Sequence, residues 1–470
     1  MSIIAVLYWL SRIIAIGAII HVVLDNRQPA KTMAWALIIY ILPLFGVIAY
    51  VFFGVNRRKE KFISRRSMDM LAKRSMLEFV EQRHLELPKS YRPMVEMFVN
   101  QSFSLPFITR KVEVLTTGYD FFPRLLGDIA NARSHVHVDM YIFEDDALGR
   151  LVADALMAKA RQGVEVRVIF DDVGCWRVKS RFFERMRRDG VEVEPFMPVH
   201  FPQFTSKANY RNHRKIVVID GQVGYVGGMN IALRYVKGTG RQAWRDTMLR
   251  LEGGAVNGLQ RAFLIDWYFV DRTLLSDRKY YTKPEDIGGL SQMVTSGPID
   301  TYPEIMQGYV RTILAAKRYV YMETPYFLPT DSVLFAMKTA AASGVDVRVM
   351  VPKNSDAHFV EWASRSYLRE AAEAGIKILL YEGGFLHSKM LISDDYIATC
   401  GSTNVDFRSF ENNFEGNMFF YDEHIALQMK AVFLHDEEQS IVLSTLTERM
   451  NPNIVHRLWD SVTRLLSPLL

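Results

Sequence analysis

The sequence predicts an α/β protein of two similar halves, each a mixed β-sheet flanked by helices, preceded by a hairpin of hydrophobic helices. Three observations predict this fold class: two hydrophobic runs near the N-terminus, an alternation of strand and helix patterns that occurs twice, and a His-Lys motif that occurs once in each half. A chain of 470 residues is long enough for two core-sized domains and a further segment.

The two hydrophobic runs, Ile3–Leu24 and Met33–Phe53, are predicted to form a transmembrane hairpin. The second run carries no formal charge and can cross a hydrocarbon core of about 30 Å, in which Pro43 and Gly46 are tolerated. The first run holds Arg12 near its middle, which leaves open whether it spans fully, tilts, or lies in the interface. A cleaved signal peptide is the competing interpretation, disfavoured because no small-residue cleavage site follows.

The charge distribution orients this hairpin. Between Arg57 and Arg74 there are eight Lys or Arg and two Asp or Glu, a surplus of six in a chain whose net charge is +5. The positive-inside rule therefore predicts that the rest of the protein lies on the cytoplasmic side. Segment 57–107 is predicted to be a helical linker or a helix on an anionic lipid surface, and both interpretations stay open.

Beyond residue 107 one pattern of strand, helix and strand occurs twice, followed each time by a motif-bearing hairpin. The expected elements are His137–Phe143, Leu148–Ala160 and Gly163–Val168 in the first half, and Tyr319–Phe327, Ser332–Ala342 and Gly344–Val349 in the second. Two copies of one unit are expected to dock about a pseudo-twofold axis. The predicted organisation is a hairpin at 1–56, a basic linker at 57–107, domains at 108–282 and 299–470, and a linker rich in Gly, Pro and polar residues at 283–298.

The repeated motif consists of a histidine, a lysine two residues later and an aspartate five residues after the lysine. The copies are His213, Lys215 and Asp220, and His387, Lys389 and Asp394; each continues into a Gly-rich tail, Gly227–Asn230 or Gly401–Asn404. Two copies with the same tail are not a plausible accident. They predict one phosphoryl-binding site assembled from two halves.

Strand geometry sorts the roles of these residues. The β-branched run after His213 predicts a strand in which His213 and Lys215 share a face, about 7 Å apart. Asp220 belongs to a turn with Gly221, so the spacing gives it and Asp394 a structural role.

The residue types define the chemistry. A neutral imidazole can attack phosphorus and form a phosphohistidine, while a second imidazole protonates the leaving alkoxide. Lys215, Lys389, Asn230 and Asn404 can hold the phosphoryl oxygens. Each histidine needs a carboxylate to fix its tautomer, and Asp246 and Glu415 are the candidates.

No cofactor or metal is expected from this sequence. The carboxylates do not cluster in a metal-binding pattern, and Cys175 and Cys400 stand far apart without metal-type spacing. An oxidising compartment is therefore not implied either.

These residues resemble the phospholipase D superfamily, which has paired HxKxxxxD motifs, and within it the bacterial cardiolipin synthases of the phospholipase D type. The likeness runs almost end to end. It includes Arg27, Pro29, Trp35, Pro43, Gly46 and Gly54, the segments 141–143, 244–246, 296–298, 324–329 and 404–410, and Leu466 and Pro468.

The resemblance implies a cytoplasmic-membrane enzyme that joins two phosphatidylglycerol molecules into cardiolipin and releases glycerol, without a metal. It implies that His213 is the nucleophile and His387 the acid/base, and it counts Lys215, Lys389, Asp220 and Asp394 with the catalytic motif. Asp246 and Glu415 would orient the histidines crosswise between the halves. Ser402 would contact phosphate, and Gly228 at the matching position of the first half would lack that contact.

Three other functions are weighed against this one. A sibling enzyme would hydrolyse its lipid to phosphatidic acid or transfer it to an ethanolamine lipid. A nucleic-acid processor is disfavoured because the catalytic body is close to neutral and carries no clustered cations. A non-catalytic membrane scaffold is disfavoured because both motifs are intact. The oligomeric state, the acyl-chain preference and the acceptor lipid stay open.

Overall fold

The strands of the two halves join into one mixed β-sheet. The computed structural model describes residues 3–24, 29–54, 87, 89–199, 210–240, 242–283, 287–465 and 467. The first-half strands are β1 (Pro106–Leu115), β2 (His135–Met140), β3 (Glu165–Asp171), β4 (Glu192–Phe196), β5 (Lys215–Ile219), β6 (Val223–Gly227) and β8 (Met248–Gly253). Those of the second half are β9 (Gly289–Ser296), β10 (Tyr319–Glu323), β11 (Asp346–Pro352), β12 (Lys377–Tyr381), β14 (Met390–Ser393), β15 (Ile397–Gly401), β16 (Glu415–Tyr421) and β17 (Ser440–Val442).

The strand order repeats outward from the centre of this sheet. The central strands β1 and β9 pair antiparallel, with Pro106 opposite Gln292. From there the first half runs β8, β6, β5, β2, β3 and β4, and the second runs β16, β15, β14, β10, β11, β12 and β17. Each motif strand therefore occupies the same place in its half, the arrangement that a pseudo-twofold axis produces.

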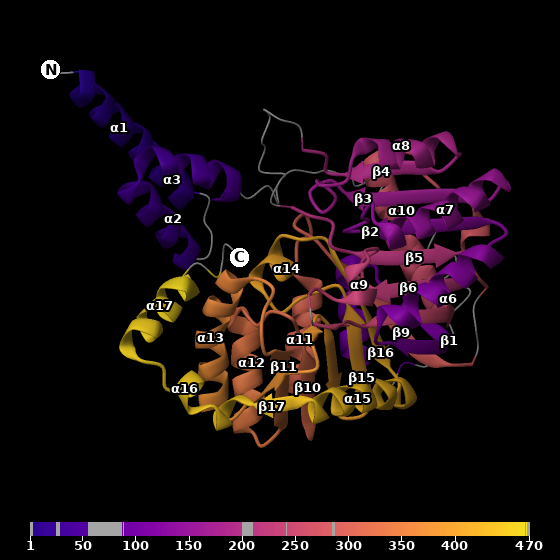
Figure 1. Cartoon of the computed structure of the whole chain (residues 1–470). Helices are drawn as coiled ribbons and strands as arrows, with labels where there is room; N and C mark the ends of the chain where they lie inside the picture. Colours follow the sequence, from indigo (N-terminus) through magenta and orange to yellow (C-terminus); the bar gives the residue numbers. More distant parts are fainter. Residues whose placement is uncertain are drawn as a thin grey trace.

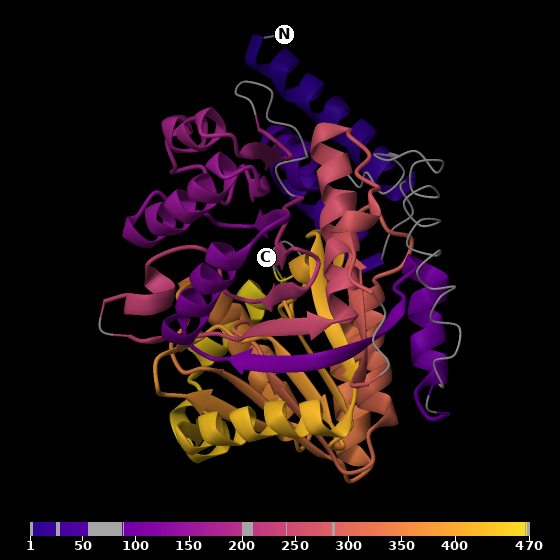
Figure 2. The same ribbon diagram turned by 90° about the vertical axis from the view of Figure 1, so that its right-hand side faces the viewer.

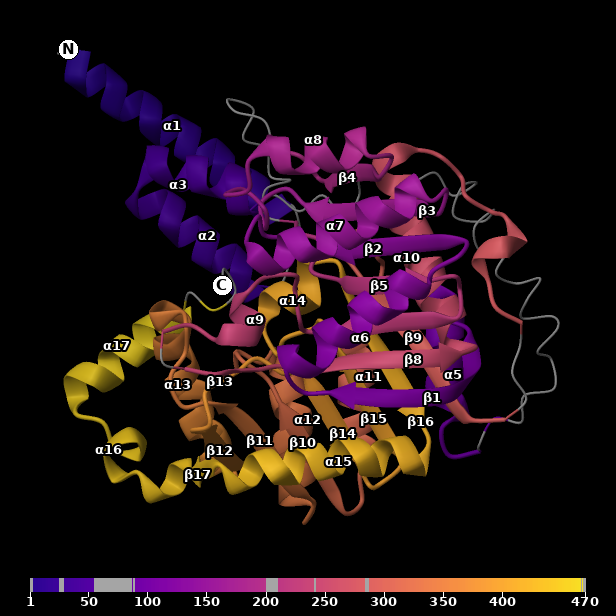
Figure 3. The ribbon, with the colours of Figure 1, turned by 45° about the vertical axis from the view of Figure 1, so that its right-hand side comes forward.

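Helices pack on the sheet in both halves, and an apolar core joins the two halves. Helices α6 (Gly118–Asn131), α7 (Ala147–Arg161) and α8 (Ser180–Arg188) pack on the first half, and α5 (Arg92–Ser102), α11 (Glu304–Ala315), α12 (Asp331–Ala342) and α13 (His358–Glu373) on the second (Figures 1 and 3). A third core joins the halves through β5, β6, β8, β14, β15 and β16, together with α10 (Ala255–Asp271) and α15 (Glu423–Glu438). The halves thus share a core and cannot shift independently without exposing it.

Shorter elements complete the fold. They are α9 (Arg234–Lys237), α14 (Phe407–Glu411), α16 (Thr447–Met450), α17 (Ile454–Leu465), the 3₁₀ turns η3 (Arg278–Tyr280) and η4 (Leu443–Thr445), and the two-stranded sheet of β7 (Trp244–Arg245) and β13 (Phe385–Leu386).

The N-terminal helices form a hairpin that projects from one edge of the body (Figures 1 and 2). They are α1 (Ile3–Leu24), α2 (Pro29–Ile41), α3 (Pro43–Ala49) and the π-helical η1 (Tyr50–Gly54). Arg12 donates a hydrogen bond to the carbonyl of Tyr40, 2.8 Å away, which ties α1 to α2. A small cluster of Ala15, Val22, Trp35, Ile39 and Tyr50 packs between them.

The second hydrophobic run, predicted to be one continuous span, is divided. Helix α2 ends at Ile41 and Pro43 begins α3, since proline lacks an N–H and fits the first turn of a helix. Within the described ranges, no helix has both the length and the apolar character needed to cross a membrane. The spanning role of the hairpin stays a prediction.

Two predicted boundaries need correction. The range 283–298, predicted to be a linker, contains the central strand β9. Its polar composition indicated a linker, but the polar side chains of Ser291 and Gln292 are buried in the sheet and hydrogen-bonded there. The Gln292 amide donates to the Ser104 carbonyl, and the Ser291 hydroxyl is hydrogen-bonded to that of Thr109. In the range 57–107, α5 is helical and β1 begins at Pro106, whereas the basic run to Arg74 lies outside the described residues.

The motif hairpins form as predicted, but their strands begin later than predicted. Strand β5 begins at Lys215, so His213 lies just ahead of the strand. The turn residues Asp220 and Gly221 have φ angles of 53° and 65°, and Asp394 and Asp395 have 55° and 61°. Positive φ at both central residues is the geometry of a tight hairpin turn that matches strand twist.

Candidate active site

Each motif histidine is fixed to the opposite half of the chain by its backbone. The N–H of His213 donates to the carbonyl of Phe414 at 2.9 Å, and the N–H of His387 donates to the carbonyl of Arg245 at 2.6 Å. Strand β13, just before His387, pairs with β7 of the first half. Each backbone carbonyl belongs to the residue directly before a carboxylate, so the same contact that holds the histidine also presents that carboxylate to it.

His213 of the first half is bound by Glu415 of the second. Its Nδ1 lies 3.0 Å and 3.1 Å from the two carboxylate oxygens, and its ring meets the edge of Tyr141 with centroids 4.9 Å apart. A carboxylate at Nδ1 favours the tautomer that carries its proton there, which leaves Nε2 with a free lone pair. His213 therefore presents a nucleophilic nitrogen.

His387 of the second half is bound by Asp246 of the first. Its Nδ1 lies 2.6 Å from Asp246 Oδ2, and the ammonium of Lys389 lies 2.8 Å from the same nitrogen. The rings of Trp244 and Phe385 pack around the imidazole, with centroids 5.4 Å and 5.7 Å away. The two halves thus exchange carboxylates, but only the second histidine has a lysine at its side.

Burial and charge set the protonation of this pair. Burial lowers the pKa of His387 to about 3, and Lys389 acts in the same direction against Asp246. Burial also lowers the pKa of His213, where Glu415 opposes the effect. The lysine of each half further lowers the pKa of the other half's histidine, so the two lysines and two histidines are coupled electrostatically.

The motif lysines lie behind the histidines. Lys215 donates to the carbonyl of His213 at 2.6 Å and sits over the ring of Tyr141, while Lys389 donates to the carbonyl of His387. Both are buried, and burial lowers the pKa of Lys215 to about 7 and that of Lys389 below its usual range. Two poorly solvated ammonium groups so close to the histidines favour the binding of an anion.

The carboxylates stay ionised despite their burial. Burial alone would raise the pKa of Asp246, but Lys389 and His387 together hold it below its usual range. Glu415 behaves in the same way, with His213 and Lys215 lowering its pKa.

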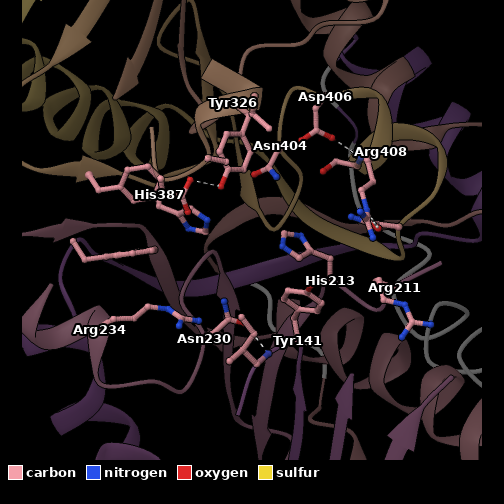
Figure 4. Close-up of a pocket in the computed structure, with 18 of the residues that line it drawn as sticks. Tyr141, Arg211, His213, Asn230, Arg234, Tyr326, His387, Asn404, Asp406 and Arg408 are labelled. Atoms are coloured by element: carbon pink, nitrogen blue, oxygen red, sulfur yellow. Dashed lines mark hydrogen bonds between the residues drawn. The ribbon is translucent and has the colours of Figure 1, made fainter. Parts of the chain in front are cut away.

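Both histidines open onto one cavity of about 860 Å³. Figure 4 shows the labelled first-half residues along one side of this cavity and the second-half residues along the other. Its lining includes Asn230 and Asn404 from the two motif tails. A volume of this size accommodates a phosphodiester headgroup with adjoining groups.

The two tail asparagines differ in how they are engaged. The Asn230 side chain accepts from the N–H of Ile142 at 3.0 Å and donates to the hydroxyl of Tyr235 at 2.5 Å. The Oδ1 atom of Asn404 is buried, and no described residue supplies it with a hydrogen bond. Asn404 therefore retains more capacity for a ligand than Asn230.

Ser402, expected to contact phosphate, points elsewhere. Its hydroxyl donates to Glu415 and accepts from the N–H of Gly416 at 3.0 Å, so it supports the carboxylate that holds His213. Gly228 takes the matching place in the first half, where a β-carbon would lie 2.0 Å from Asp246 Oδ1. The absence of a side chain at Gly228 therefore leaves space for the carboxylate of Asp246, which takes the place that Glu415 has in the second half.

Asp220 and Asp394 lie at the hairpin turns and bind backbone. Asp220 accepts N–H bonds from Arg133, Ser134 and His135 at 2.7 to 2.9 Å. Asp394 accepts equivalent bonds from residues 317, 318 and 319. Their place with the catalytic residues is therefore corrected: each fixes the motif hairpin to the start of the neighbouring strand, the structural role that the spacing predicts.

Several cavity residues were not singled out as site residues from the sequence. Tyr141 packs on His213, Trp244 packs on His387, and Tyr326 and Arg408 line the cavity. Each lies within a segment that carried the family resemblance, and Trp244 directly precedes Arg245-Asp246. That adjacency was the available signal. Among the described residues, no group of three or more His, Cys, Asp or Glu side chains could hold a metal ion.

Known protein families match both halves of the chain. A family model described as cardiolipin synthase, PLD-like domain, matches residues 125–253 and 309–437, and one described as phospholipase D-nuclease N-terminal matches residues 13–54. The chain is 38% identical over 458 residues to a cardiolipin synthase of Geobacillus sp. (strain WCH70), covering 95% of this chain and 90% of that protein. It is 36% identical over 466 residues to the major cardiolipin synthase of Bacillus subtilis (strain 168), covering 96% of each.

A solved structure has the same fold. Phosphatidylserine synthase of Haemophilus influenzae Rd KW20 superposes with a TM-score of 0.63 at 16% sequence identity, covering 82% of this chain and 100% of that one. At this identity the likeness concerns the fold alone.

Proposed function

The chain belongs to the family of cardiolipin synthases with paired phospholipase D-like domains, which makes it a phosphatidyltransferase, and we propose that it joins two phosphatidylglycerol molecules into cardiolipin with release of glycerol. One observation supports this mechanism above all. His213 and His387 line the same cavity, and each is held by a carboxylate from the opposite half of the chain.

In the first step Nε2 of His213 attacks the phosphorus of one phosphatidylglycerol. A P–N bond forms and the bond from phosphorus to the glycerol headgroup oxygen breaks. His387 donates its proton to the leaving alkoxide, so free glycerol departs. Lys215 and Lys389 stabilise the charge that builds on the phosphoryl oxygens.

Protonation of His387 is coupled to the substrate in this scheme. Burial and the neighbouring Lys389 lower the pKa of His387 to about 3. A phosphodiester anion bound in the cavity beside His387 favours the imidazolium, because a nearby opposite charge raises a histidine pKa. The acid therefore becomes competent when substrate is bound.

In the second step the hydroxyl of another phosphatidylglycerol attacks the phosphohistidine. His387, now neutral, takes the hydroxyl proton, the new P–O bond forms, and the P–N bond breaks to restore His213. One phosphodiester replaces another, so no nucleotide is needed. Water attacking in place of the lipid would give phosphatidic acid, which defines the sibling reaction.

We further propose that the N-terminal hairpin holds the enzyme in the cytoplasmic membrane, with the domains on the cytoplasmic side. Large apolar side chains on the outer faces of its helices support this, among them Trp9, Ile13 and Tyr40, each at least 60% exposed.

The test is the product balance of the purified enzyme with phosphatidylglycerol alone. Cardiolipin and glycerol are expected in equal amounts, without added metal or nucleotide. His213→Ala should abolish both, whereas His424→Ala, at an exposed histidine of α15, should leave both unchanged. Phosphatidic acid as the main product would overturn the proposal in favour of hydrolysis.

A further inference from the structure

Helix α17 has its polar side against the protein and its apolar side outward. Asp460 and Thr463 are among its buried residues. The outer side carries Ile454, Val455, Leu458, Trp459, Val462 and Leu465. These positions recur at helical spacing and form one stripe. A helix that docks on a soluble body normally buries its apolar side, so the inversion calls for a partner outside.

The inward polar side is well bonded to α13. Asp460 pairs with Arg369 at 2.7 Å, and Arg464 pairs with Glu370 at 2.6 Å and donates to Ser366 at 3.2 Å. The guanidinium of Arg464 also lies 4.1 Å from the centroid of Tyr367. These contacts fix the rotation of α17, so the apolar stripe cannot turn inward without breaking the buried Arg369–Asp460 pair and the partly exposed Arg464–Glu370 pair.

The outward stripe is strongly exposed. Ile454 is 83% exposed, Leu458 65% and Leu465 73%. The exposed titratable side chains of α17 are His456 and Arg457. Because neither is acidic, this face of the helix is not repelled by an anionic lipid surface. An apolar stripe that includes a tryptophan, with an exposed arginine and no exposed acidic residue beside it, is typical of a helix lying in the plane of a membrane interface.

The stripe continues through aromatic contacts to residues that line the catalytic cavity. Trp459 meets Trp362 of α13 edge-on with centroids 5.6 Å apart, and Trp362 meets Phe359, one turn nearer the start of α13, at 6.3 Å. Ala357 and Val360, which flank Phe359, line the cavity. Figures 1 and 3 show α17 on the outer side of α13, on the side of the molecule from which the N-terminal helices project.

We propose that the outer face of α17, with Phe359, inserts into the interfacial layer of an anionic bilayer and sets the cavity mouth at the level of the lipid headgroups. This proposal rests on the proposed function, because a cavity that takes phospholipid must reach its substrate from a membrane. Acyl chains would stay among the apolar side chains of the stripe while the phosphodiester enters between the two histidines.

The test measures depth in the whole enzyme reconstituted into phosphatidylglycerol vesicles. Cys175 and Cys400 are buried, so a single cysteine at Leu458→Cys can carry an environment-sensitive fluorophore. Leu151→Cys on α7, where the native leucine is 51% exposed, is the matched control. Lipids with a nitroxide about 5–10 Å below the headgroups should quench the label at 458 and not at 151. Equal quenching at both positions would overturn the proposal, as would crosslinking of 458 to a second copy of the chain.

A paired activity assay separates this proposal from the catalytic one. The double variant Leu458→Glu, Val462→Glu should lose about tenfold or more in kcat/KM on vesicles, since apolar contact with acyl chains is replaced by charge. Its rate on a monomeric short-chain phosphatidylglycerol should match that of the unsubstituted enzyme, which also verifies folding. Equal rates on vesicles would overturn docking by α17, whereas failure of the unsubstituted enzyme on both substrates would instead refute the proposed function.

Discussion

Gly228 lies so close to Asp246 that a β-carbon at this position would fall 2.0 Å from the Oδ1 atom of the carboxylate. At the matching place in the second half, Ser402 donates a hydrogen bond to Glu415. In the second half the Ser402 hydroxyl therefore supports the longer glutamate side chain. In the first half a glycine leaves the space that the shorter aspartate side chain occupies. The two sites are related but not interchangeable.

Gly228→Ser is expected to displace Asp246 from His387. The kcat for cardiolipin formation should fall on the order of 10- to 100-fold, less than when the carboxylate is removed, because Asp246 is displaced but stays ionised near His387. Steady-state rates with a check of the unfolding midpoint test this. Ser402→Ala, which removes one hydrogen bond but causes no clash, should cost less. An unchanged rate for Gly228→Ser would contradict the role given to Asp246.

Glu415→Gln and Asp246→Asn are expected to leave the fold intact and reduce kcat by roughly 10³- to 10⁴-fold, because an amide stabilises the wrong imidazole tautomer. The exposed Glu438→Gln serves as the control and should have the rate of the unsubstituted enzyme. Rates within twofold of that enzyme for either buried variant would exclude crosswise orientation.

The pH profile is expected to report Lys215. Burial lowers its pKa to about 7, so its positive charge is present below this pH and is lost as pH rises through it. The alkaline limb of kcat/KM should therefore lie near pH 7, and that of kcat should lie higher because bound phosphate raises the pKa. In Lys215→Arg the charge persists and this limb should vanish. The same limb in the variant would assign the titration to another group.

Asp220→Ala is expected to affect stability rather than chemistry. Its carboxylate accepts three backbone N–H bonds, and losing them should lower the free energy of unfolding by about 2–4 kcal/mol. The kcat of the folded enzyme, measured at low temperature, should stay within a few-fold of the original. A large loss of kcat at unchanged stability would return Asp220 to the catalytic residues.

Much of the fold could be predicted because local patterns and tertiary structure agree. Helix α7 and strand β3 lie within a few residues of their predicted positions, as do α12 and β11. The motif hairpins follow from β-branched runs ended by a turn dipeptide. Strand β9 was missed because its polar residues satisfy their hydrogen bonds only through partners far away in sequence, such as Thr109.

The sequence was sufficient to predict which residues form the site, but not which contacts they make there. Spacing grouped the histidines with the lysines, and the need of each histidine for a carboxylate suggested Asp246 and Glu415. The direction of the Ser402 hydroxyl and the clearance at Gly228 depend on packing between β-strands of one half, which no local pattern encodes. The division at Pro43 was visible in the sequence, but tolerance of proline in membrane helices argued for a continuous run.

The central claim is that two imidazoles from separate halves divide one phosphoryl transfer, with His213 as the nucleophile. A phosphatidyl ester of p-nitrophenol tests it directly, because this leaving group needs no acid and His387→Asn cannot activate the acceptor. The account predicts a burst of one p-nitrophenolate per enzyme followed by a stall, with the phosphatidyl group found on His213 by peptide mass spectrometry at alkaline pH. A burst in His213→Asn, or a label on any other residue, would contradict it.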